Sequence, residues 1–340
     1  MLLNRMFLVG FDGCALRRGY WLRRALQEFP PAGVILFDKN IDGSMQNFSS
    51  PSQLKELTAE LVELADGPLF IAVDQEGGRV CRLKEQAGFS GTTTAAELGH
   101  QPPEQATLPA AEAMAAELAK YGINLNLAPV ADLNLNPDNP IIARYERSFG
   151  PDPDSVAAHC RAFIQGHHKF GIACCLKHFP GHGSTSGDSH LGFVDITKDW
   201  QKKELAPYET MIRQGQVDAV MTAHVVHEGL DASGLPATLS PVMINTLLRQ
   251  NLGFDGVIIT DDLQMKAITS RYGFREAVQR AVLAGADLLI VGNNLERNPN
   301  ALAQGIAAVQ ELLDQGRISE GRIRASFRRI DLLLQFVSRG

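Results

Sequence analysis

Eight short apolar runs rich in Val, Ile and Leu recur along the chain, and longer amphipathic stretches separate them. Within each run, polar and apolar positions hardly alternate, which is typical of strands buried on both faces of a parallel sheet. The pattern therefore predicts eight strands, at residues 6–10, 34–37, 69–73, 123–129, 172–176, 219–222, 257–260 and 288–291.

The stretches between the runs predict helices with recognisable end signals. One of them follows Pro51 and stops at Gly67-Pro68, and Ser240 is placed to cap another. The predicted helices span residues 52–66, 103–121, 154–170, 201–214, 241–251, 275–284, 300–315 and 319–338.

Alternation of strands and helices specifies a parallel α/β fold, and eight strands in one chain predict a single-domain (β/α)8 TIM barrel. A doubly wound open sheet is the alternative, but no Gly-x-Gly-x-x-Gly motif follows the first strand, where a nucleotide would bind. No Pro- or Ser-rich linker divides the chain, so we expect one domain over residues 1–340.

The composition excludes several classes of protein. Of the 340 residues, 45% are hydrophobic and 21% are charged, which is enough apolar material for a large core and excludes intrinsic disorder. The net charge of −6, without a long basic run, argues against nucleic acid or an anionic membrane as a partner. We expect a monomer.

The five cysteines indicate a reducing compartment. Their odd number and irregular spacing are typical of reduced thiols, and the adjacent Cys174 and Cys175 would point to opposite faces of a strand. The N-terminal apolar stretch is too short for a signal peptide, and no apolar run is long enough to span a membrane. We therefore expect a cytoplasmic protein.

In a barrel of this kind, the chemistry lies at the C-terminal ends of the strands. A single Asp after a strand is most often a helix cap, but six strands here end in polar or ionisable residues, which favours a functional site. These residues are Asp74-Gln75-Glu76, Asp132, Lys177-His178, His224, Asp261-Asp262 and Asn293.

The densest polar stretch is the loop at 177–190, which contains three His, one Asp and one Lys among flexible glycines. In one interpretation, His178, His182 and His190 bind a divalent metal together with Asp188, although the spacing matches no helical zinc motif. In another, Asp188 orients His190 and raises its basicity for proton transfer. A purely structural loop is the third interpretation.

Two further groups carry candidate chemistry. Asp261 is expected to point into the rim of the barrel as a nucleophile, general base or metal ligand, while Asp262 caps the next helix. The alternative is that both residues are caps. Asp74, with Arg79 and Arg82, is suited to hold a polar ligand, or forms a surface ion-pair cluster.

At these residues the sequence resembles glycoside hydrolase family 3, and within it the bacterial β-N-acetylglucosaminidases. The similarity extends over roughly residues 5–335, and its most specific motif is the long one that ends in Asp-Ser-His. The matching stretches are VDQEGGRVCRL at 73–83, NLAPVADL at 126–133, ERSFG at 146–150, KHFPGHGSTSGDSH at 177–190, MTAHV at 221–225 and GVIITDDLQM at 256–265.

The resemblance implies a role for each matching residue. Asp261 corresponds to the nucleophile that forms a covalent glycosyl-enzyme, and His190 to the general acid/base, with Asp188 as its dyad partner. The segment at 139–147 is longer than is usual in the family, so Arg144 is a rival to Arg147. The residues implied to hold the N-acetylglucosamine ring are Asp74, Arg82, Arg147, Lys177 and His178.

The implied activity is that of a retaining exo-β-N-acetylglucosaminidase that acts on peptidoglycan fragments during cell-wall recycling, with no metal or organic cofactor. Three alternatives remain at this point. A phosphorylase would use phosphate instead of water as the acceptor, a metal-dependent hydrolase would use the histidine loop, and a non-catalytic barrel would only bind the sugar.

Overall fold

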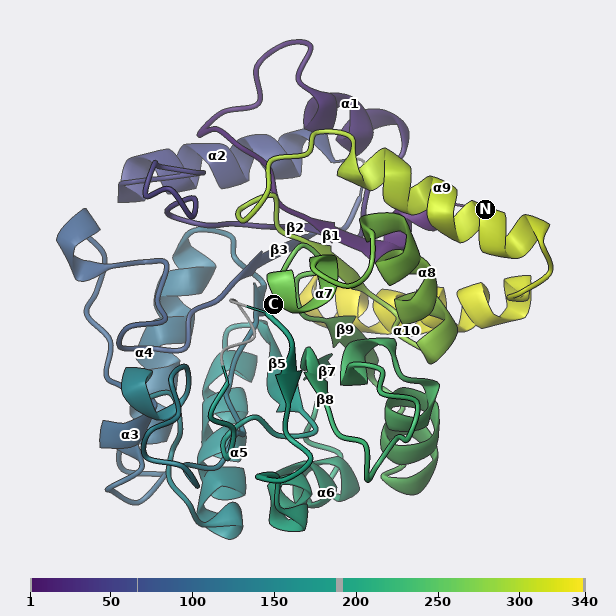
Figure 1. The fold of residues 1–340 in the computed structure, drawn as a ribbon. Coiled ribbons are helices and arrows are strands. Elements are labelled where there is room, and N and C mark those ends of the chain that lie inside the picture. Colours follow the sequence, from purple (N-terminus) through teal and green to yellow (C-terminus); the bar gives the residue numbers. More distant parts are fainter. Residues whose placement is uncertain (1, 66, 188–191, 339–340) are drawn as a thin grey trace.

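A computed structural model describes residues 2–65, 67–187 and 192–338. Within these ranges, eight parallel strands form a barrel in the order β10-β1-β2-β3-β4-β5-β7-β9, seen at the centre of Figure 1. A bridge between Ile259 and Leu288 joins β9 to β10, so the sheet closes on itself. The strands are β1 Phe7–Val9, β2 Gly33–Ile35, β3 Phe70–Val73, β4 Leu125–Asn126, β5 Ala173–Phe179, β7 Ala219–Thr222, β9 Val257–Thr260 and β10 Leu289–Val291.

The predicted barrel and all eight of its predicted strands are thus confirmed. Two short strands, β6 (Val194–Asp195) and β8 (Val225–Val226), were not predicted, and they pair with each other outside the barrel.

The helices surround the barrel (Figure 1). Those that match the predicted ones are α2 Pro51–Leu64, α4 Thr107–Lys120, α5 Pro153–His168, α6 Ala206–Arg213, η6 Val242–Asn251 (a π-helix), α8 Phe274–Ala284, α9 Ala301–Asp314 and α10 Glu320–Val337. Ser240 caps η6 as predicted, because its hydroxyl accepts the N–H of Met243 at 3.0 Å. In the parts of the chain that the structure describes, we find no helix with the length and apolarity needed to cross a bilayer.

Several short helices were not predicted. The longest, α1 (Trp21–Glu28), has no side-chain cap at Tyr20, so no end signal marks it in the sequence. The others are η1 Leu3–Met6, η2 Glu85–Ala87, α3 Ala95–Leu98, η3 Ala143–Tyr145 and η5 Ala237–Leu239. The short helix η4 Lys202–Leu205 is the first turn of the helix predicted at 201–214, and α7 Lys266–Thr269 is the helix expected after Asp262.

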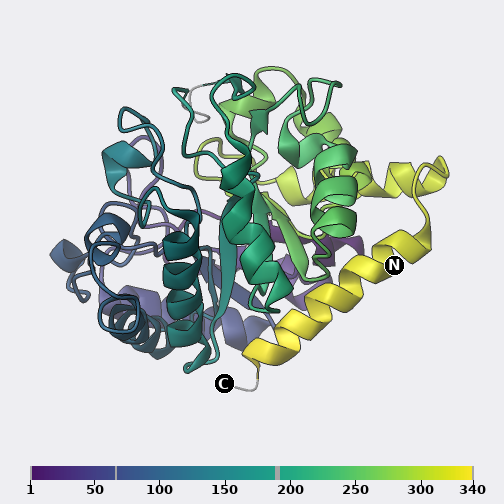
Figure 2. The ribbon, with the colours of Figure 1, turned by 90° about the horizontal axis from the view of Figure 1, so that it is seen from below.

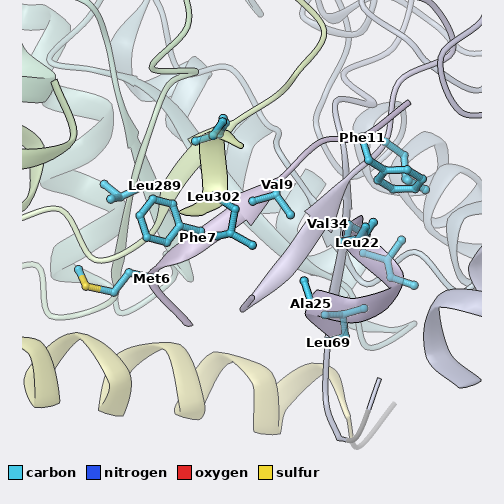
Figure 3. Packing of buried hydrophobic residues seen from close by; sticks show 14 of the residues in the cluster. Met6, Phe7, Val9, Phe11, Leu22, Ala25, Val34, Leu69, Leu289 and Leu302 are labelled. Atoms are coloured by element: carbon cyan, nitrogen blue, oxygen red, sulfur yellow. The ribbon is translucent and has the colours of Figure 1, made fainter. Parts of the chain in front are cut away.

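Successive strand residues face two different cores, as the two-residue period of a strand requires. One set packs outward on the helices: Figure 3 shows Phe7, Val9 and Leu289 of the strands near Leu302 of α9. The other set fills the barrel. Cys174 belongs to an outer cluster and Cys175 to the inner one, which confirms their predicted opposite orientation.

The barrel interior is closed at one end by α10, which crosses beneath the strands (Figure 2). Ile330 and Leu334 of α10 share the inner cluster with Phe70, Ala173 and Val257, which lie at the start of their strands. The plug is therefore apolar and lies at the N-terminal end of the barrel, which leaves the C-terminal end for polar chemistry.

The substitution Gly10→Ala should destabilise the barrel by about 3 kcal/mol. A Cβ atom on Gly10 would lie 1.7 Å from the carbonyl oxygen of Gly292, a backbone atom that cannot rotate away. Urea unfolding would measure the effect. Gly321→Ala is the control, because a Cβ atom there meets only an ordinary contact at 3.6 Å and helix propensity favours alanine. Equal unfolding midpoints for the two variants would contradict the prediction.

Candidate active site

A pocket of about 300 Å³ opens at the C-terminal end of the barrel. The strand period explains its polar floor: Asp74, Lys177 and Asp261 each lie two residues beyond a strand residue of the inner core, so they continue the inward-facing set. The pocket is lined by Asp74, Glu76, Arg79, Val80, Arg82, Ile141, Tyr145, Arg147, Lys177, His178, His182, Met221 and Asp261.

Lys177 is the most deeply buried charge of the pocket, with its side chain 2% exposed. Its Nζ lies 2.9 Å from Oδ1 of Asp74 and 2.7 Å from Oε1 of Glu76, and Arg82 contacts the second oxygen of Asp74 at 3.3 Å. Burial alone would raise the pKa of Asp74, but the charges of Lys177 and Arg82 outweigh it and hold that pKa well below its usual range. The carboxylate is therefore ionised at neutral pH.

Glu76 forms a two-point ion pair with Arg147. The Nε of Arg147 lies 2.7 Å from Oε2 of Glu76, and its Nη2 lies 2.8 Å from Oε1. Burial raises the pKa of Glu76, but Arg147 and Lys177 more than compensate and lower it to about 2. Arg147, and not its rival Arg144, lines the pocket; the guanidinium of Arg144 lies 6.0 Å from the ring centre of Tyr145.

His178 is oriented by Asp132, which lies behind it. Its Nδ1 is 2.7 Å from Oδ2 of Asp132, and Oδ1 of the same carboxylate accepts the backbone N–H of His182 at 2.8 Å. Burial would raise the pKa of Asp132, but the nearby His178 outweighs it and lowers the pKa. If Nδ1 donates to this ionised carboxylate, the other ring nitrogen, Nε2, faces Arg147 at 3.3 Å as an acceptor.

Asp261 lies in the pocket as predicted, whereas Asp262 does not have the predicted position at a helix start. Asp261 lines the pocket directly after β9, and its Oδ1 accepts the backbone N–H of Asp262 at 2.8 Å. Asp262 accepts the N–H groups of Gln264 and Gly292 at 3.0 and 3.2 Å. The predicted helix cap is wrong, because α7 begins only at Lys266 and its N-cap is Met265; Asp262 stabilises the turn before the helix instead.

The predicted Asp188–His190 dyad lies outside the described residues, and these two are also half of the predicted four-residue metal set; the other two, His178 and His182, line the pocket. Among the residues that are described, no group of three or more His, Cys, Asp or Glu side chains is arranged to hold a metal ion. The stem of the loop is held by Glu204, whose carboxylate accepts the N–H of Gly183 at 3.0 Å and the hydroxyl of Ser184 at 2.6 Å.

Sequence reasoning missed the roles of Glu76, Asp132 and Glu204. Glu76 could have been found only by noting that two buried cations require more than one carboxylate. That argument requires knowing that Lys177 and Arg147 are buried side by side, which the sequence does not show. Five of the predicted strand-end residues do not line the pocket: Gln75, Asp132, His224, Asp262 and Asn293. His224 contacts Thr238 and the backbone oxygen of Asp262, and Asn293 donates to the backbone oxygen of Gly10.

Replacing Glu76 by Gln should destabilise the fold by about 3–5 kcal/mol, because the buried Arg147 would lose its carboxylate partner and Lys177 would lose one of its two. Glu276→Gln is the control, since it breaks an exposed pair with Arg280 that should contribute less than about 0.5 kcal/mol. Denaturant unfolding at pH 7 would measure both. Equal effects of the two substitutions would contradict the prediction.

The same carboxylate predicts a pH dependence. Because its folded pKa is lowered from 4.5 to about 2, Glu76 contributes stability that is fully present above about pH 4.5 and is lost as the pH falls towards 2. The stability difference between wild type and Glu76→Gln should therefore shrink in acid. A difference that is constant from pH 7 to pH 3 would contradict this.

For Asp262 we expect the stability of the fold to depend on pH with the opposite sign. Burial, with smaller contributions from the Asp261 and Asp74 charges, raises its pKa from 3.8 to about 7. The folded chain keeps this proton where the unfolded chain has lost it, so stability falls as the pH rises from 3.8 to 7. Asp262→Asn should therefore gain stability relative to wild type at pH 8 but not at pH 4. Asp314→Asn, the same chemical change at an exposed site, is the matched control.

The comparisons with known proteins agree with this geometry. The family model described as "Glycosyl hydrolase family 3 N terminal domain" matches residues 22–333. A beta-hexosaminidase of Tolumonas auensis is 39% identical over 278 residues, which are 80% of this chain and 78% of that protein. One of Neisseria meningitidis is 38% identical over 84% of this chain and 78% of its own length.

Solved structures show the same relationship. A glycoside hydrolase family 3 beta-N-acetylglucosaminidase of Paenibacillus matches 99% of this chain with a TM-score of 0.88 and 36% identity, although this chain spans only 62% of its length. A beta-N-acetylhexosaminidase of Beutenbergia cavernae matches 98% of this chain and 97% of its own, with a TM-score of 0.82 and 29% identity. The chain therefore belongs to glycosyl hydrolase family 3, and it is a glycosidase built on the barrel of that family's N-terminal domain.

Proposed function

We propose that this glycosidase is a retaining exo-β-N-acetylglucosaminidase that removes terminal N-acetylglucosamine from peptidoglycan fragments in the cytoplasm. The observation that carries the proposal is the position of Asp261, whose carboxylate lines a pocket that is closed below by the barrel core and walled by fixed charges. A blind pocket of this size suits the single sugar at the end of a glycan. The names of the relatives support the choice of a hexosaminide.

The walls of the pocket supply the groups that recognise a sugar. Asp74 is an ionised acceptor for ring hydroxyls, while Arg82, Lys177 and Arg147 are donors. Each of these side chains is held by an ion pair before substrate arrives. Substrate binding therefore requires little rearrangement of the pocket side chains. Polar groups that are already in position stabilise a transition state most effectively.

In the first step, a carboxylate oxygen of Asp261 attacks the anomeric carbon, and His190 donates its proton to the leaving oxygen as the glycosidic bond breaks. In the second step, neutral His190 takes a proton from water, the water oxygen attacks the anomeric carbon, and the Asp261 ester breaks. Asp188 orients the imidazole. An imidazole suits the role of general acid/base because its neutral form adds no negative charge beside the nucleophile.

The cytoplasmic location is supported by the cysteines. All five are free thiols in the structure, and four are buried. Burial is the main reason that the pKa of Cys160 and of Cys175 is raised above the usual value, so these thiols remain protonated and unreactive. Thiols of this kind fit a reducing compartment.

Hydrolysis of p-nitrophenyl β-N-acetylglucosaminide tests the proposal. Asp261→Asn should reduce kcat by about 10³-fold or more, because the amide cannot form the glycosyl ester. A slow 5-fluoro substrate should add one sugar to the wild-type mass, on the peptide that contains Asp261. The distant Asp314→Asn, which is the same chemical change on the surface, should keep full activity.

Three outcomes would contradict the proposal. An initial product of inverted anomeric configuration would exclude the retaining mechanism, and sugar 1-phosphate formed in phosphate buffer would make the protein a phosphorylase. Full activity of Asp261→Asn would remove the assigned nucleophile.

A further inference from the structure

Arg79 lies at the mouth of the pocket. It follows Gly77 and Gly78, whose positive φ values of 106° and 58° turn the chain outward after Glu76. The side chain is exposed but still lines the pocket. Its guanidinium carbon lies 4.3 Å from the centre of the Tyr145 ring, which fixes the group in place.

Arg79 differs from the other cations that line the pocket. Arg82 pairs with Asp74, Arg147 pairs with Glu76, and Lys177 pairs with both carboxylates. Among the described residues, Arg79 has no ion pair, and its contact is with the face of an aromatic ring. A cation–π contact holds a guanidinium without neutralising it, so the charge remains available to a ligand.

Tyr145 provides a firm support for this charge. It ends the short helix η3, which follows a turn built around the buried Asn139. The Asn139 side-chain oxygen accepts the N–H groups of Ile141 and Ile142 at 3.0 and 2.7 Å, and its amide donates to the backbone oxygen of His182 at 2.8 Å. The ring is therefore tied to the pocket wall.

The positive and negative charges in the interior of the pocket balance, so the interior does not attract an anion. Three carboxylates line it opposite three cations, and the whole chain carries a net charge of −6. A negatively charged substituent on a substrate would therefore be unfavourable deep in the pocket and favourable beside Arg79. The leaving group of an exo-glycosidase substrate occupies this mouth, because the terminal sugar fills the floor.

We propose that Arg79, held over Tyr145, determines leaving-group specificity by binding a carboxylate on the sugar that follows the cleaved bond. This inference rests on the proposed function and adds to it a residue that distinguishes an acidic leaving sugar from a neutral one. An exposed charge at the rim of a pocket mainly increases the rate at which an oppositely charged substrate binds, and this effect weakens as the ionic strength rises.

Two disaccharides with the same terminal sugar provide the test. In N-acetylglucosaminyl-β-1,4-N-acetylmuramic acid the leaving sugar carries a carboxylate, and in N,N′-diacetylchitobiose it is neutral. The kcat/KM ratio of acidic over neutral substrate should fall roughly fivefold in Arg79→Gln, mainly through KM. Added salt should lower the ratio in wild type and leave it nearly constant in the variant.

Arg144→Gln is the matched control, because Arg144 is also exposed and beside Tyr145 but does not line the pocket. Its ratio should stay within about twofold of wild type. An unchanged ratio in Arg79→Gln, or an equal fall in both variants, would overturn the inference and leave the proposed function intact. Wild-type protein that cleaves neither disaccharide would overturn both.

Discussion

The pocket depends on one buried cation, Lys177. An ammonium group removed from water costs several kcal/mol unless it is closely paired, and here two carboxylates from the loop after β3 surround it. Those carboxylates in turn engage Arg82 and Arg147. The ends of β3 and β5 and the segment before α5 are thus joined by charge pairs.

The two ends of the barrel are physically different because of what closes each one. At the N-terminal end, apolar side chains of α10 fill the interior, which keeps water out of the barrel. At the other end, the next inward-facing positions are charged. Low polarity beneath the pocket strengthens every electrostatic interaction above it, so the apolar plug contributes to the tight pairing around Lys177.

Strand period and strand-end polarity were sufficient to predict the barrel and to place Asp74, Lys177 and Asp261 together. Both signals are local, since each strand displays its own pattern. Glu76 and Asp132 were predicted only as strand-end residues, and their roles were missed because these depend on partners far away in sequence, Arg147 and His178. The helix α1 was missed for another reason: its start has no side-chain cap, and packing against the barrel stabilises it instead.

The division between floor and mouth separates two kinds of recognition. In the floor of the pocket, the electric field of each charge pair falls off steeply with distance. In the proposed complex these groups recognise the neutral terminal sugar by directional hydrogen bonds. A solvent-exposed guanidinium that is fixed by an aromatic face keeps its field, so it acts at longer range on a charged leaving group. Because Arg79 and Tyr145 lie on surface segments, their identity can change without disturbing the charge balance around Lys177. Leaving-group preference can therefore vary within this fold while the recognition of the terminal sugar stays constant.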